Sequence, residues 1–96
     1  MKSLEDIIII ISKNKDELSL KYGLKDIAIF GSYSQGQYNA SSDIDILVDF
    51  NKPIGIEFID LAIELEKILN HKVDLVSKNG VKPQYFQSIE KDLTYV

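Results

Sequence analysis

The chain has 96 residues, 45% of them hydrophobic, and a formal net charge of −4, which predicts one domain over residues 1–96 with a single core. It contains no cysteine, which excludes disulfides, thiol catalysis and cysteine-ligated zinc, and only one histidine, His71, which excludes a multi-histidine metal cluster. The acidic balance disfavours direct binding to nucleic-acid backbones, because that binding needs a surplus of lysine and arginine.

The five consecutive isoleucines at 7–11 are the only stretch that resembles a targeting signal. They are too few for a membrane span, which needs about 20 apolar residues. Glu5 and Asp6 precede them, where a secretory signal carries basic residues. We therefore expect a soluble, cytoplasmic protein that does not associate with membranes.

The first predicted element is a helix between Ser3 and Gly23. Ser3 can cap it, with Asp6 three residues later in a capping-box arrangement, and Gly23 is a natural residue to end it. Apolar residues at 4, 7, 8, 11, 18 and 22 fit one helical face. Isoleucine forms helices poorly, so a strand at 7–11 is the alternative. A helix is favoured because no turn signal comes before Gly23.

Two strands are predicted next, with a polar loop between them. The apolar run 27–30 is interpreted as a buried strand, and residues 31–42, rich in Gly, Ser, Asn and Gln, as a loop with at most one helical turn. Residues 44–50 alternate, with apolar side chains at 44, 46, 48 and 50. This period of two predicts a strand with one face in the core and one face that carries carboxylates.

The second half of the chain predicts two more helices and two more strands. An amphipathic helix over 54–69 ends at Asn70, and a third strand covers 73–76. A turn at 79–80 precedes a helix that Lys82-Pro83 can open and that continues through Ile89. Residues 94–96 predict a short final strand. The chain shows no repeat and no linker, in agreement with a single domain.

Asp43 and Asp45 are the first candidate site residues. Residues i and i+2 of a strand point to the same face, so we predict that the two carboxylates aim together. Adjacent carboxylates repel each other, and a cation between them is the simplest explanation for such a pair. Magnesium prefers oxygen ligands from one or two carboxylates, phosphates and water. Asp49 continues the same face but lies further along the strand, so it is not included in the predicted site.

Asp74 and the pair Gly31-Ser32 complete the predicted site. Asp74 lies inside an apolar strand, and a third acid there could form a two-ion site that clamps the attacking and leaving oxygens of an in-line displacement. The sequence does not identify a general base, and Asp74 is the best placed candidate for that role. Gly31 would let a triphosphate approach the main chain, and Ser32 would donate its hydroxyl and backbone N–H to the outer phosphates. Together these residues predict metal-assisted nucleotidyl transfer.

Three further ring-bearing residues of the chain receive simpler interpretations. Tyr33 and Tyr38 flank the loop and could stack on a nucleotide base, but a role in covering the core is favoured. His71 belongs to no motif and is predicted to be a surface residue at the end of a helix.

The spacing Phe30-Gly-Ser-x10-Asp43-Ile-Asp45-Ile-Leu-Val48 resembles the signature of the polymerase β-like nucleotidyltransferase superfamily. The segments 53–58, 72–76, 82–83 and 94–96 resemble the minimal nucleotidyltransferases, so the resemblance covers about residues 4–96. It implies an α/β (α+β) fold, in which a small mixed β-sheet is flanked by helices. It implies that Asp43, Asp45 and Asp74 are metal ligands and that Gly31 and Ser32 bind phosphate, with two Mg²⁺ ions and ATP as substrate.

The resemblance also implies a partner and a biological role. Minimal nucleotidyltransferases are typically encoded beside a HEPN-domain protein, with which they form a toxin–antitoxin pair. The implied activity is protein adenylyltransferase: AMP moves from ATP onto a tyrosine of the HEPN toxin, a ribonuclease, and silences it. A hetero-oligomer with this toxin is therefore expected.

One departure from the family pattern keeps alternatives open. Many relatives carry Gly-Ser-x-Ala-Arg-Gly, whereas this chain has Gly31-Ser-Tyr-Ser-Gln-Gly36, so that Gln35 replaces a common arginine. A neutral amide cannot neutralise triphosphate charge, which predicts weaker ATP binding or a slower reaction. The first alternative is an antitoxin that blocks its partner by contact alone. The second is a small-molecule nucleotidyltransferase, which is disfavoured because such enzymes usually add a helical region that holds the acceptor.

Overall fold

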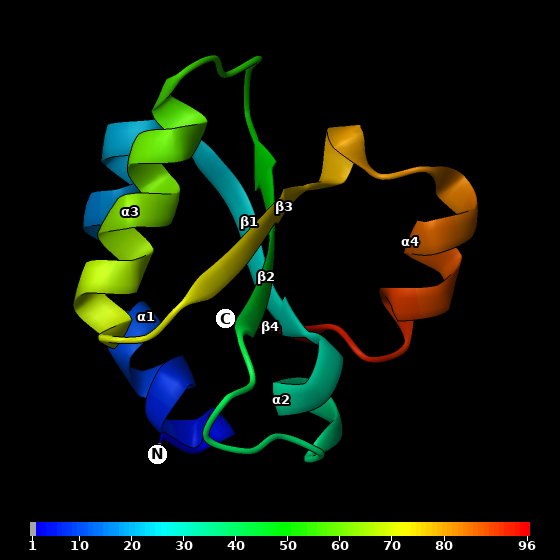
Figure 1. Cartoon of the computed structure of the whole chain (residues 1–96). Coiled ribbons are helices and arrows are strands. Elements are labelled where there is room, and N and C mark those ends of the chain that lie inside the picture. Colours follow the sequence, from blue (N-terminus) through cyan, green and yellow to red (C-terminus); the bar gives the residue numbers. More distant parts are fainter. Residues whose placement is uncertain (1) are drawn as a thin grey trace.

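The computed structural model describes residues 2–96. The elements follow in the order α1 (Leu4–Tyr22), β1 (Leu24–Phe30), α2 (Gly31–Gln35), β2 (Ile44–Phe50), α3 (Glu57–Leu69), β3 (Val73–Ser77), the 3-10 turn η1 (Lys78–Gly80), α4 (Pro83–Glu90) and β4 (Thr94–Tyr95). The strands form one sheet in the order β3-β2-β1-β4, with β3 parallel to β2 and the other neighbours antiparallel. The predicted small mixed sheet flanked by helices is confirmed (Figure 1).

The first helix begins and ends where the sequence predicts. The Ser3 hydroxyl accepts a hydrogen bond from the Asp6 N–H, and the Asp6 carboxylate accepts one from the Ser3 N–H, each at 3.1 Å. Gly23 ends the helix with a φ of 69°, a conformation that glycine adopts without steric cost. Ile7 and Ile11, four residues apart, are fully buried on one face. The isoleucine run is therefore helical, and the alternative strand at 7–11 is wrong.

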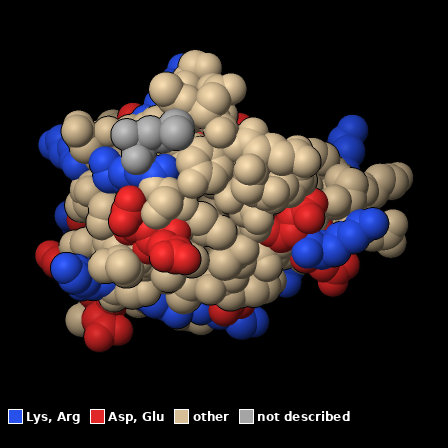
Figure 2. All heavy atoms as spheres, turned by 90° about the horizontal axis from the view of Figure 1, so that it is seen from below, with Lys and Arg blue, Asp and Glu red and all other residues tan. Residues whose placement is uncertain are grey.

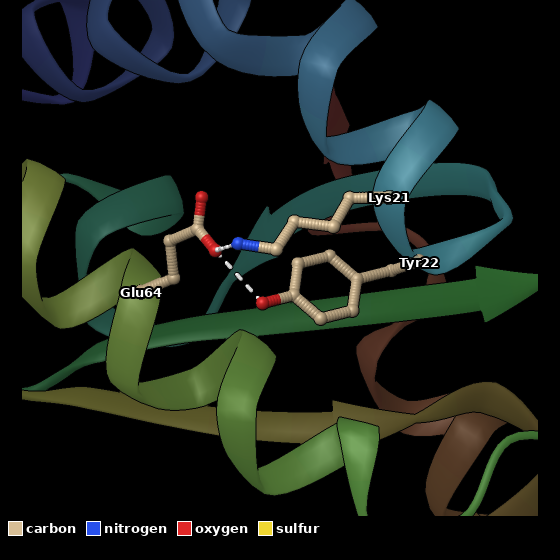
Figure 3. A network of polar contacts seen from close by, with 3 residues as sticks. All are labelled: Lys21, Tyr22 and Glu64. Atoms are coloured by element: carbon tan, nitrogen blue, oxygen red, sulfur yellow. Dashed lines mark hydrogen bonds and ion pairs between the residues drawn. The ribbon is translucent and has the colours of Figure 1, made fainter.

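Helices α1 and α3 lie on the same side of the sheet and enclose the main core (Figure 1). Burial of each large apolar side chain there contributes about 1.5–3 kcal/mol. The two helices are also joined by a polar network at the surface (Figure 3), in which the Glu64 carboxylate accepts hydrogen bonds from the Tyr22 hydroxyl at 2.7 Å and the Lys21 ammonium at 3.0 Å. The fully or nearly fully buried core side chains include Ile7, Ile11, Leu18, Ile27, Ile29, Tyr33, Ile44, Ile46, Val48, Leu61, Leu65 and Leu69.

Helix α4 lies on the opposite side of the sheet and covers only part of it (Figure 1). Phe30 of β1, Leu47 of β2 and Ile89 of α4 form a second, smaller buried cluster there. Leu47 is buried although it lies between Asp45 and Asp49 on the face that the sequence pattern assigned to carboxylates. This face of the sheet therefore has an apolar part under α4 and a polar part around Asp45.

The remaining boundaries follow the predictions with small shifts. Helix α2 is the single turn predicted within the loop, and α4 and β4 occupy the predicted places. Helix α3 begins at Glu57 rather than at 54 because residues 55–58 form a turn, in which the Phe58 N–H donates to the Gly55 carbonyl. Asn70 ends α3 with a φ of 48°. Within residues 2–96, no helix combines the length and the apolar character that crossing a membrane requires.

Candidate active site

Strand β1 leads directly into α2, and the junction depends on Gly31. Its φ is +71°, in the left-handed region that residues with a side chain rarely adopt. A Cβ at this position would lie 2.1 Å from Oδ2 of Asp45 and 3.0 Å from its Cγ. The backbone of Gly31 therefore lies directly against the Asp45 carboxylate, and only glycine fits there without a shift.

Three neighbouring strands place Asp45 between the end of β1 and the start of β3. On one side Asp45 pairs with Phe30, the last residue before Gly31, across the antiparallel β1–β2 ladder. On the other side it pairs with Asp74 across the parallel β2–β3 ladder. Residues paired in this way point to the same face of the sheet. The strand that the sequence predicts around Asp74 therefore lies directly beside the strand of Asp45.

The Asp45 carboxyl group is difficult to ionise in this environment. Burial is the main reason that its pKa rises from 3.8 to about 6. The negative charges of Asp74 and Asp43, and a hydrogen bond with Asp74, raise the pKa further. A bound divalent cation would remove this repulsion, and a donor set made only of carboxylate oxygens suits Mg²⁺. By the chemistry of their oxygen donors, these side chains are therefore compatible with a magnesium ion.

Asp43 is exposed and lies one residue before β2. Strand alternation therefore does not by itself fix the direction of its side chain, although its charge contributes to the raised pKa of Asp45. Over the described range 2–96, no three His, Cys, Asp or Glu side chains are gathered closely enough to form a ready ion-binding group. The assignment of Asp43, Asp45 and Asp74 as metal ligands, and of Gly31 and Ser32 as phosphate binders, stays a prediction.

Helix α2 is tied to the C-terminal segment that leads into β4. The Ser34 hydroxyl donates to the Asp92 carbonyl and lies 2.7 Å from the Thr94 hydroxyl. The Gln35 amide donates to the Asp92 carboxylate at 2.9 Å. Gln35, where the family resemblance predicts an arginine, therefore hydrogen-bonds to an acidic side chain 57 residues later in the chain. Ser32 is half-buried in the first turn of the same helix.

The loop between α2 and β2 packs against the core through aromatic residues. Tyr33 is fully buried and stacks on Tyr38 with ring centroids 4.3 Å apart, so the prediction that Tyr33 covers the core is confirmed. His71 is half-buried rather than a free surface residue: its ring meets Tyr33 edge-on and hydrogen-bonds to the Ser42 carbonyl. No motif marks His71, because its partner lies 29 residues earlier.

Asp49, which is not included in the predicted site, is engaged locally: its carboxylate accepts a hydrogen bond from the Phe50 N–H at 3.0 Å.

Relatives of known sequence share almost the full length of the chain. The sequence model of the nucleotidyltransferase domain matches residues 11–96. A protein of Thermococcus cleftensis named protein adenylyltransferase MntA is 39% identical over 97 residues, which cover 100% of this chain and 98% of the relative. A protein of Methanocaldococcus jannaschii, provisionally named a protein adenylyltransferase, is 46% identical over 98 residues and 100% of both chains.

Solved structures share the same fold. One, provisionally described as a minimal nucleotidyltransferase, has a TM-score of 0.83 and 26% identity over 97% of this chain and 95% of that chain. A chain from a toxin–antitoxin structure with AMP-PNP has a TM-score of 0.72 and 29% identity over 98% of this chain and 72% of that chain. A chain from a complex of tri-AMPylated Shewanella oneidensis HEPN toxin with MNT antitoxin has a TM-score of 0.70 and 26% identity over 93% of this chain and 70% of that chain. With its Gly31–Asp45–Asp74 arrangement and these relatives, the chain belongs to the nucleotidyltransferase domain family, among the minimal nucleotidyltransferases.

Proposed function

We propose that this protein is a Mg²⁺-dependent protein adenylyltransferase that transfers AMP from ATP to a tyrosine of a HEPN-domain toxin and thereby acts as its antitoxin. The observation that carries the proposal is the environment of Asp45, a half-buried carboxylate against the Gly31 backbone and in register with Asp74. Acids held together in this way destabilise a protein unless a cation neutralises them. The named relatives support AMP as the transferred group and a HEPN toxin as the acceptor.

Each site residue has a distinct part in this proposal. Asp43, Asp45 and Asp74 would hold magnesium, which supplies charge neutralisation for the triphosphate and polarises the phosphoryl group under attack. Gly31 leaves room for the phosphates to approach the main chain, because it has no side chain. Ser32, half-buried beside it, offers a hydroxyl donor to the outer phosphates.

The chemical step is an in-line displacement at the α-phosphorus of ATP. The tyrosine oxygen forms a bond to this phosphorus while the bond to the oxygen that bridges to the β-phosphate breaks, and pyrophosphate leaves with the bonding electron pair. The phenolic proton passes to a carboxylate. Asp74 is the candidate base because it is exposed and lies on β3, an edge strand that an acceptor protein can approach.

The surface charge agrees with a protein acceptor rather than a nucleic acid. The net charge is −4, and all basic side chains of the chain are lysines. On the face drawn in Figure 2, the lysines among residues 2–96 occur in separate groups, with acidic side chains between them, rather than as a continuous basic stripe. Nucleic-acid binding normally needs such a stripe.

The decisive experiment measures label transfer from α-labelled ATP to the purified HEPN partner in the presence of Mg²⁺. We expect the wild-type protein to label a tyrosine, identified by mass spectrometry, and Asp45→Asn to lose about 100-fold or more of the rate. Asp49→Asn is the matched control, because Asp49 lies on the same strand and its carboxylate accepts a hydrogen bond from the adjacent Phe50 N–H, the one contact of this kind found for it among residues 2–96. Absence of transfer, or equal transfer by an Asp43→Ala/Asp45→Ala variant, overturns the proposal.

The same variants separate the two other functions. If the Asp43→Ala/Asp45→Ala protein still neutralises the toxin in cells, the protein acts as an antitoxin by contact alone. If label leaves ATP only when a small hydroxyl or amine compound is supplied, and never reaches the partner protein, the acceptor is a small molecule.

A further inference from the structure

We infer that His71 is a positioning residue for the nucleotidyl-transfer site: it fixes the backbone immediately before Asp43 through a hydrogen bond to the Ser42 carbonyl. His71 acts together with Tyr33 and Tyr38, and these three residues are called the aromatic clamp below. The inference rests on the proposed role of Asp43 as a metal ligand. It concerns residues that belong to neither the Gly-Ser nor the Asp-x-Asp motif.

The hydrogen bond from His71 is short and its direction is defined. Nε2 of His71 lies 2.6 Å from the Ser42 carbonyl oxygen. A carbonyl oxygen can only accept, so the imidazole carries its proton on Nε2 and donates it. Both residues are half-buried. The contact is therefore shielded in part from competing water, which strengthens it.

Ser42 is held on three sides. Its N–H donates to the Asn39 carbonyl at 3.1 Å, its hydroxyl accepts from the Asn39 N–H at 3.0 Å, and its carbonyl accepts from His71. The two bonds to Asn39 are local and shape the turn, but they do not attach it to the rest of the protein. The bond to His71 is the contact that ties Ser42 to the segment between α3 and β3.

The backbone of Asp43 is consequently fixed from both ends. His71 holds the residue before it, and Lys72 holds the residue after it by accepting from the Ile44 N–H at 3.0 Å. The Asp43 side chain is exposed, so packing contributes little to holding it in place. Its position relative to Asp45 therefore depends on this pair of backbone contacts. Without the His71 bond, the local contacts with Asn39 and the Ile44 contact would remain, but Ser42 would lose its tie to the segment between α3 and β3.

The aromatic clamp also connects Asp43 with the phosphate side of the site. The His71 ring meets Tyr33 edge-on, with centroids 5.9 Å apart and planes at 82°, and Tyr33 stacks on Tyr38. Tyr33 is fully buried two residues after Gly31. Its hydroxyl has no hydrogen-bond partner within residues 2–96, so packing rather than the hydroxyl holds the ring. One cluster thus joins the segment after Gly31 to the segment before Asp43.

Two substitutions at His71 separate the hydrogen bond from the ring contact. His71→Phe keeps an aromatic ring against Tyr33 but removes the donor, whereas His71→Gln places an amide donor near the position of Nε2 and removes the ring. We expect His71→Phe to weaken Mn²⁺ binding about 10-fold, measured by electron paramagnetic resonance of free Mn²⁺ with an ATP analogue that has a non-cleavable α,β bridge. His71→Gln should stay within about threefold of the wild-type affinity.

AMP transfer to the HEPN partner provides the second measurement. His71→Phe should need about 10-fold more Mg²⁺ for half-maximal rate, in line with its weaker metal binding. Tyr22→Phe is the control for a general loss of stability, because it removes a hydrogen bond at the other end of β1 and should leave metal affinity unchanged.

The outcomes are distinct from those that test the proposed function. Mn²⁺ affinity of His71→Phe within twofold of wild type, or equal losses in His71→Phe and His71→Gln that follow their loss of thermal stability, overturns the positioning role. If the wild-type protein transfers no AMP but His71→Phe alone weakens Mn²⁺ binding, the proposed activity fails and the positioning role stands.

Discussion

Gly31 and Asp45 exclude any side chain between them: a Cβ on Gly31 would lie 2.1 Å from the Asp45 carboxylate oxygen, far inside van der Waals contact. The glycine therefore has two separate functions in the fold. It adopts a left-handed φ of +71° at the junction of β1 and α2, and it leaves space for the acid of the neighbouring strand. The proposed phosphate-binding residue and the proposed metal ligand are therefore in direct contact.

The first prediction concerns this contact. Gly31→Ala should destabilise the fold by about 1–2 kcal/mol through backbone strain, and should also displace the Asp45 carboxylate and lower AMP transfer about 100-fold or more. Gly36→Ala is a matched control, because Gly36 has a φ of +73° but no atom within 4 Å of an added Cβ. It should show the same strain and retain activity. Urea unfolding and the transfer assay measure the two effects, and equal activity in both variants would contradict the prediction.

The second prediction concerns pH and Asp45 in metal-free protein. Because burial and the neighbouring acids raise its pKa from 3.8 to about 6, the folded state binds more protons than the unfolded state between these values, so stability falls as pH rises through this window. Asp45→Asn should therefore stabilise the protein at pH 7.5 by about 1–2 kcal/mol, less than the full shift implies because water reaches the half-buried group.

Urea unfolding with a chelator, between pH 4 and pH 8, measures this effect. The advantage of Asp45→Asn should shrink as pH falls from about 6 towards 4, because the folded wild-type carboxyl becomes protonated and uncharged, like the amide of the variant. Added Mg²⁺ should stabilise the wild-type protein more than the variant. The prediction fails if the wild-type protein is as stable as Asp45→Asn at pH 7.5 in the chelator.

The third prediction concerns the network between α1 and α3 (Figure 3). The Tyr22 hydroxyl is the main cause of the lowered pKa of Glu64, and Lys21 adds to it. Tyr22→Phe should cost about 0.5–1.5 kcal/mol at pH 7, the usual net value of a hydrogen bond. A lowered pKa stabilises the fold above the unfolded-state value, so the difference between the proteins should shrink as pH falls below about 4.5. A pH-independent difference in the unfolding midpoint would contradict it.

The fourth prediction concerns Gln35, which bonds to Asp92. Gln35→Arg should form an ion pair with the same carboxylate, so the KM for ATP should change by less than about threefold. The double variant Gln35→Arg/Asp92→Asn frees the guanidinium and should lower the KM for ATP about 10-fold. Asp92→Asn alone is the control. If the single variant already lowers the KM as far as the double variant, Asp92 does not restrain the side chain.

Local sequence patterns predicted most elements because their causes lie within a few residues. The capping box of α1 joins residues three apart, the strand at 44–50 follows from its period of two, and the ends at Gly23 and Asn70 follow from their left-handed backbone. The predicted start of α3 at 54 is too early for a local reason as well. The apolar periodicity begins at 54, whereas residues 55–58 still form a turn and the helix begins at Glu57. The spacing of Gly31, Ser32, Asp43 and Asp45 was likewise visible in the chain.

What the sequence determined by itself was therefore the set of elements, the family and the acids available to a metal site. The tertiary structure decided which of these residues meet: the parallel β2–β3 register places Asp74 beside Asp45, and the close packing of β1 on β2 places Gly31 against it. It also gave His71 and Gln35 partners 29 and 57 residues away. Such pairings depend on strand order and on the packing of distant segments, which no local periodicity encodes.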